Sequence, residues 1–97
     1  MTDIHQMQII WQGRPVGLFK NLVPDMWYLD GHWQANQTEA ALAFEALARQ
    51  LNAQEISQNW DKGIEVILQS DEGHTTYAVV FSLSDSHELF VRRIMNN

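Results

Sequence analysis

The sequence has no cysteine, few basic residues and no long run of apolar residues. The absence of cysteine excludes disulfide bonds, thiolate metal sites, iron–sulfur clusters and a cysteine nucleophile, and it suits a reducing compartment. No window approaches the roughly 18 consecutive apolar residues of a membrane-spanning helix. The first ten residues have neither the basic region nor the apolar run of a secretory signal. We therefore expect a cytoplasmic protein that does not bind a membrane.

The charge balance is acidic: 12 Asp and Glu residues stand against 6 Lys and Arg residues, which gives a net charge of −6. An acidic surface repels phosphate groups, so nucleic-acid binding is not expected. The five glycines are dispersed, and no glycine-rich phosphate loop is present. If the acidity has a role besides solubility, it would steer the protein toward a basic partner.

The length and the aromatic content indicate one domain with a core of large rings. A chain of 97 residues is long enough for one domain, residues 1–97, and too short for two. It should bury roughly two thirds of its unfolded surface. Four tryptophans are present, and rings of this size would dominate a small core or an interface.

Alternation of apolar and polar residues predicts strands in the first third of the chain. The stretch IHQMQIIWQ, residues 4–12, alternates loosely. Turn residues follow at 12–15, and VGLFKNLV, residues 16–23, resumes an extended pattern. Because the connection is short, these two strands should pair as an antiparallel hairpin.

The stretch DMWYLDGHW, residues 25–33, concentrates aromatic and polar side chains. Read with a period of two, one face is apolar and is expected in the core: Trp27, Leu29, Gly31 and Trp33. The other face is mixed and should be exposed: Met26, Tyr28, Asp30 and His32. Asp-Gly is also a favoured hairpin turn, so two short arms around Asp30 and Gly31 are an alternative. The uninterrupted apolar face favours one strand, with Gly31 as the position for a bulge.

One amphipathic helix is predicted over residues 37–51, with Asn36 as its N-cap and Asn52 as its stop. Glu45 and Arg49 would form an outward i, i+4 ion pair. The apolar stripe has helical spacing: Ala40, Phe44, Leu47, Ala48 and Leu51.

Residues 54–63 lack a regular pattern and are expected to be irregular, with Trp60 lying over the edge of the core. Three further strands follow at 63–69, 74–83 and 87–94, joined by tight turns. The predicted order is therefore β-β-β-α-β-β-β. It indicates an α+β domain in which a largely antiparallel sheet carries the helix on one face. A partly closed barrel with the helix plugging one end is the alternative.

No catalytic or metal-binding motif is present. The histidines, at positions 5, 32, 74 and 87, lack the spacing of zinc ligands. The stretch SLSDSHE, residues 82–88, contains serine, aspartate and histidine, but its composition is that of a hairpin turn, and a Ser–His–Asp triad normally assembles from distant positions. We therefore predict no catalytic residues, no metal and no cofactor.

The chain ends with two arginines on a predicted strand. Arg92 and Arg93 should point to opposite faces, so they do not form one basic patch. One of them must face the interior, either at the end of the strand or paired with a carboxylate.

These features favour a non-catalytic protein-interaction module that binds a basic partner, such as an inhibitor or immunity-type protein. In size and charge the chain resembles small bacterial α+β proteins, some of which neutralise toxins. The contact residues would lie on or near the aromatic strand and in the irregular segment: Tyr28, Asp30, His32, Trp33 and Trp60.

Two alternatives remain open for the function. In one, the chain binds a small molecule, or acts as a minor enzyme, through a pocket between helix and sheet lined by Trp33, Phe44 and Trp60. In the other, it is a homodimer that forms by pairing of sheet edges or by burial of Trp60.

Overall fold

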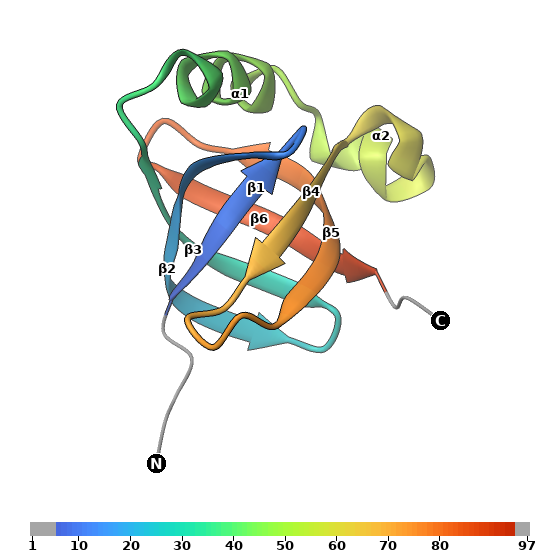
Figure 1. Cartoon of the computed structure of the whole chain (residues 1–97). Helices are drawn as coiled ribbons and strands as arrows, with labels where there is room; N and C mark the ends of the chain where they lie inside the picture. The colour runs from blue at the N-terminus through green and yellow to red at the C-terminus, as the bar shows by residue number, and fades with distance from the viewer. Residues whose placement is uncertain (1–5, 95–97) are drawn as a thin grey trace.

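The structure, a computed structural model, describes residues 6–94 as six antiparallel strands and two short helical regions (Figure 1). The strands are β1 (Gln6–Trp11), β2 (Arg14–Asp25), β3 (Tyr28–Ala35), β4 (Ile64–Gln69), β5 (Thr75–Leu83) and β6 (Glu88–Ile94). They form a closed barrel in the order β1-β2-β3-β6-β5-β4, in which β1 also pairs with β4. The predicted antiparallel sheet of six strands is therefore present, and it closes on itself.

Closure changes one expectation about assembly. An open sheet would offer two edge strands for pairing with another chain. In the barrel, each of the six described strands has a neighbour on both sides. A homodimer built by edge pairing therefore has no free edge to use among residues 6–94.

Two glycines let the barrel interior hold large rings. Phe19 and Trp33 are partners across β2 and β3, and both are buried. A Cβ added to Gly17 would lie 2.5 Å from the Trp33 ring, and one added to Gly31 would lie 2.7 Å from the Phe19 ring. Both positions require glycine because each ring occupies the space of the missing side chain.

A bulge lies in β2, opposite Gly31, and not in β3 as predicted. The register passes from Lys20–His32 to Val23–Asp30, so β2 has one more residue than β3 across this interval. Asn21, within it, adopts a positive φ of 54°. The bulge bends β2 and changes the direction of its side chains beside β3.

The prediction of a single strand through Asp30 and Gly31 is confirmed, because β3 runs without interruption from Tyr28 to Ala35. Leu29 and Trp33 point inward, as expected. Trp27 does not: it lies in the turn between β2 and β3 and is 41% exposed. The alternation rule failed there because the strand begins only at Tyr28, after Met26 enters the left-handed region with a φ of 58°.

Helix α1 (Glu39–Arg49) lies across one end of the barrel (Figure 1). It is shorter than predicted, and its N-cap is Thr38 and not Asn36. The Thr38 hydroxyl accepts a hydrogen bond from the backbone N–H of Ala41 at 3.1 Å. Asn36 instead donates its side-chain amide to the carbonyl of Pro15 at 3.2 Å, and thus fixes the approach to the helix.

The buried face of α1 differs from the predicted stripe. Ala41, Phe44 and Ala48 are buried, whereas Leu47 is 45% exposed. The two small alanines let the helix approach the barrel closely, and the Phe44 ring then packs 5.2 Å from the ring of Trp33. The helix is therefore rotated relative to the stripe that hydrophobicity alone predicts.

Replacing Thr38 by alanine should lower the free energy of unfolding by about 1 kcal/mol, because an N-cap oxygen satisfies a backbone N–H that otherwise has no intrahelical partner. Urea denaturation of the purified variant measures this loss. Thr38→Ser keeps the hydroxyl and should retain most of the stability. A serine variant as unstable as the alanine variant would contradict the capping role.

Residues 54–63, predicted to be irregular, belong mostly to helical structure: α2 (Ala53–Gln58) and a single 3-10 turn, η1 (Trp60–Lys62). Asn52 does not end α1 but caps α2, since its side-chain oxygen accepts from the N–H of Gln54 at 3.0 Å. Ile56 of α2 packs on Val79 and Phe81, on the outer face of β5. The side chains of β5 are therefore buried on both faces of the sheet. Among residues 6–94, neither helix has the length and apolarity needed to cross a membrane.

Candidate functional site

The outer face of β3 carries the side chains that the sequence predicts as contacts. Asp30 and His32 are exposed, and Tyr28 is half-buried. β6 lies beside β3, so these residues gain neighbours from the far end of the chain: Tyr28 faces Arg92, Asp30 faces Phe90 and His32 faces Glu88. Two adjacent surfaces result, one polar and one aromatic.

The polar surface is a pocket of about 280 Å³, which we call the acidic pocket. It spans the bulge of β2, the middle of β3 and the turn that precedes β6. Its lining residues are Asn21, Val23, Asp30, Gly31, His32, Ser86 and Glu88. Two of the three predicted contacts on the exposed face, Asp30 and His32, therefore share one concavity.

The register places both carboxylates of the acidic pocket on the same face of the sheet. Glu88 is opposite His32, and Asp30 is two residues along β3, so Asp30 and Glu88 are diagonal neighbours on adjacent strands. Ionised carboxylates only accept hydrogen bonds, and their natural ligands are ammonium and guanidinium groups. Lys20 stands opposite His32 on the other side, in β2. The pocket is thus suited to one cationic side chain beside an existing lysine.

Tyr28 belongs to the aromatic surface, and the structure corrects its predicted exposure. Its ring stacks on Phe90 with the centroids 5.1 Å apart and the planes 7° apart. It also meets Phe81 edge-on at 5.8 Å. The ring is half-buried because α2 covers the neighbouring part of β5, and Tyr28 packs against that cluster.

Trp60 joins the same surface through an arginine. The guanidinium carbon of Arg92 lies 4.2 Å from the centroid of the Trp60 ring and 5.7 Å from that of Tyr28. Both distances are within the range of cation–π attraction. Trp60 is 38% exposed. The chain thus brings Tyr28 and Trp60, 32 positions apart in the sequence, onto one face.

Trp33 is not part of this surface. It is 2% exposed, and its indole N–H donates to the carboxylate of Glu45 at 2.7 Å. The three residues predicted to line a pocket between helix and sheet, Trp33, Phe44 and Trp60, do not lie around one cavity. Trp33 and Phe44 pack directly on each other, while Trp60 lies on the outer face beside Arg92.

Arg49 links α1 to the turn between β5 and β6, which borders the acidic pocket. Its guanidinium donates to the carbonyl of Ser84 at 2.9 Å and lies 3.3 Å from Nδ1 of His87. It also forms ion pairs with Glu45 at 3.8 Å and Asp85 at 3.6 Å. The predicted Glu45–Arg49 pair exists, but it faces the barrel rim and not the solvent, because both side chains bond to the barrel.

The stretch SLSDSHE, residues 82–88, contains a hairpin turn, as predicted. The N–H of His87 donates to the carbonyl of Ser84 at 3.0 Å, and the N–H of Ser84 donates to the carbonyl of Glu88 at 2.9 Å. The hydroxyls of Ser84 and Ser86 lie 2.9 Å apart and bond to each other. The His87 ring faces Arg49, so the three residue types do not form a triad.

No group of three or more His, Asp or Glu side chains within residues 6–94 is placed to hold a metal ion. The ring centroids of His32 and His87 lie 6.1 Å apart. His74 lies in the turn before β5. His5 is outside the described residues.

Sequence reasoning missed Glu88 and Arg92 as neighbours of the predicted site. Both lie on β6, and the period-two pattern that reveals a strand does not reveal which strand lies beside it. Comparisons with protein families, with curated proteins and with solved structures find no match. The chemistry of the surface is therefore the basis for the function proposed below.

Proposed function

We propose that the chain is a non-catalytic protein-binding module that captures a basic segment of a partner on the outer face of β3 and β6. Asp30 and Glu88 would hold a lysine or arginine side chain of that segment. An inhibitor or immunity-type protein is the concrete form of this proposal. The observation that carries it is the acidic pocket, in which two exposed carboxylates on adjacent strands line one concavity.

The surface beside the acidic pocket supports the proposal. Tyrosine, tryptophan and arginine are the residues that most often dominate binding energy at protein interfaces. Tyr28, Trp60 and Arg92 form a contiguous group here, and Tyr28 is separated from Asp30 by a single residue of β3. A partner that reaches both surfaces would combine an ionic anchor with aromatic contacts.

The form of the pocket favours binding over catalysis. Asp30, His32 and Glu88 are exposed to solvent, whereas catalytic sites gain much of their effect by excluding water. The net charge of −6 also favours encounter with a basic partner. The proposal includes a cytoplasmic location, which the cysteine-free composition favours.

The test is affinity capture from the source cells with three matched baits. The parent chain should retain a partner at low salt and release it at high salt, since exposed charge pairs are screened by ions. The Asp30→Asn, Glu88→Gln double variant should retain that partner about tenfold less, the effect of losing roughly 1.4 kcal/mol of binding energy. Its thermal unfolding midpoint should equal that of the parent, because both side chains are exposed.

The control bait is Asp71→Asn, Glu72→Gln. These two residues lie in the exposed turn between β4 and β5, so the variant has the same net charge as the test variant. It should capture the partner as well as the parent does. Equal losses of captured partner in both double variants would show that net charge alone controls binding, and would contradict the assigned pocket.

A further inference from the structure

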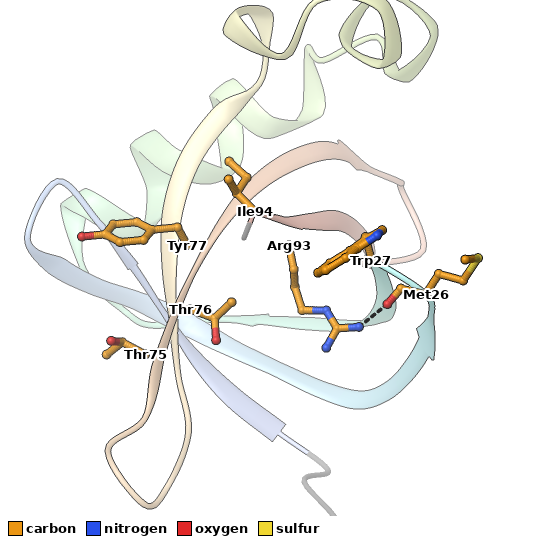
Figure 2. Close-up of a pocket in the computed structure, with 7 residues that line it drawn as sticks. All are labelled: Met26, Trp27, Thr75, Thr76, Tyr77, Arg93 and Ile94. Carbon is orange, nitrogen blue, oxygen red and sulfur yellow. Dashed lines mark hydrogen bonds between the residues drawn. The ribbon is translucent and has the colours of Figure 1, made fainter. Parts of the chain in front are cut away.

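A second and larger cavity, of about 590 Å³, lies where the turn between β2 and β3 meets the end of β6 and the start of β5 (Figure 2). We call it the arginine cavity. It is lined by Met26, Trp27, Thr75, Thr76, Tyr77, Arg93 and Ile94. It shares no lining residue with the acidic pocket.

Arg93 is the arginine that faces the inside of the barrel. Its partner across β5 is Ala78, a core residue, whereas Arg92 is on the outer face beside Trp60. The backbone N–H of Arg93 donates to the carbonyl of Trp27 at 2.7 Å. One terminal nitrogen of the guanidinium donates to the carbonyl of Met26 (Figure 2). The side chain is therefore held at the mouth of the barrel by the β2–β3 turn.

The guanidinium has donors that the described residues do not satisfy. Its Nε is buried and has no hydrogen-bond acceptor there. The ion pairs found within residues 6–94 involve Arg49 and Lys62, and none joins Arg93 to a described carboxylate. Arg93 is partly exposed, so the cost falls on the buried Nε alone: a buried donor without an acceptor is unfavourable and calls for an explanation.

The walls of the arginine cavity combine apolar and polar side chains and are partly exposed. Figure 2 shows the Trp27 ring beside the guanidinium of Arg93, with Thr76 on the adjoining strand and Tyr77 at the far rim. Trp27 and Tyr77 are both exposed large side chains. Large apolar side chains beside a few polar groups, in a concavity of roughly 300–1,000 Å³, are typical of small-molecule sites.

We propose that the arginine cavity binds a small organic carboxylate with an aromatic or aliphatic body. Arg93 lines the cavity, and the carboxylate supplies acceptor oxygens to its terminal guanidinium N–H groups, the charge-assisted pairing that guanidinium favours. The hydroxyl of Thr76 can donate a further hydrogen bond. The body of the ligand covers the ring of Trp27 and the side chain of Ile94, which removes apolar surface from water.

The test is a titration of the 15N-labelled full chain with indole-3-acetate and, separately, with octanoate. The indole N–H signals of the four tryptophans report on different places, and the Trp27→Phe variant identifies the signal of Trp27. We expect a saturable shift of that signal, with little change at Trp33, whose indole N–H is bonded to Glu45. Indole-3-acetamide, which has the same body without the charge, should bind about tenfold more weakly or worse, the effect of losing a hydrogen bond to a charged group.

The Arg93→Gln variant should weaken indole-3-acetate binding by a similar factor of about ten. Arg14→Gln is the matched control, because it makes the same change in charge at the opposite end of β2 from the cavity. It should bind as the parent does. Equal affinity for the acetate and the acetamide in the parent chain would overturn the proposal, even if Arg93→Gln fails to fold. So would the absence of a saturable shift with both carboxylates.

Discussion

Replacing Trp33 by alanine is expected to lower the free energy of unfolding by about 3–5 kcal/mol, the usual cost of removing a large buried ring. The ring is 2% exposed, packs on Phe44 at 5.2 Å and covers Gly17. Its loss also removes the hydrogen bond to Glu45, which ties α1 to the barrel. Domains of this size have roughly 5–15 kcal/mol of stability in total, so this single change should remove a large share of it.

The control for this prediction is Trp27→Ala. The alternation of the sequence puts both tryptophans on one buried face, but Trp27 lies in a turn and is 41% exposed. Its replacement should cost about 1 kcal/mol or less, as is usual for surface positions. Urea denaturation measures both values, and a change in midpoint without a change in slope indicates a change in stability. Similar losses in the two variants would mean that Trp27 is packed in solution.

The second large effect is expected at Ile56, where alanine should cost about 2–5 kcal/mol. Ile56 is the buried residue of α2, and its side chain is 1% exposed. It packs on Val79 and Phe81, so its truncation leaves a cavity under the helix. Urea denaturation measures the loss, and hydrogen exchange should show faster exchange in α2 than in the barrel strands, because local contacts of α2 are lost first.

Leu42→Ala provides the comparison for Ile56. Leu42 lies on α1 and is 65% exposed, so the same kind of truncation removes little buried surface. Its effect should stay within about 0.5 kcal/mol. If Ile56→Ala were equally mild, α2 would not be packed on the barrel as described.

Much of the fold follows from local patterns. Period-two alternation predicts the strand at Ile64–Gln69 and assigns Leu29 and Asp30 to opposite faces of β3, as the structure shows. It fails at Trp27, because the strand begins only at Tyr28 and Trp27 lies in the turn before it. Local patterns thus predict the faces of an element better than its ends.

Hydrophobic periodicity predicted the buried face of α1 only in part and did not predict the presence of α2. Leu47 was expected to be buried, yet hydrogen bonds from Trp33 to Glu45 and from Arg49 to Ser84 rotate α1 away from the predicted orientation. Phe44 and Ala48 stay buried and Leu47 becomes exposed. The helix of residues 53–58 has a single buried position, Ile56, which is too few to produce a visible stripe. Such elements are defined by partners that lie far away in the sequence.

Only the part of the candidate site that lies on a single strand could be predicted from the sequence. Asp30 and His32 are on the exposed face of a recognisable strand, so the sequence could point to them. Glu88 reaches them only through the pairing of β3 with β6, and Trp60 reaches Tyr28 only through Arg92. No local feature of the sequence encodes these contacts.

The strand order has a consequence for how the site comes into being. The first three strands precede the helices and the last three follow them, and the two groups meet only where β3 pairs with β6 and β1 pairs with β4. Residues 56 positions apart, His32 and Glu88, face each other across one of these junctions. Contacts between such distant segments form late and slowly during folding, because closing a long loop costs entropy first. The acidic pocket lies on that junction, so neither half of a growing chain can present it, and the pocket is complete only when synthesis has delivered β6.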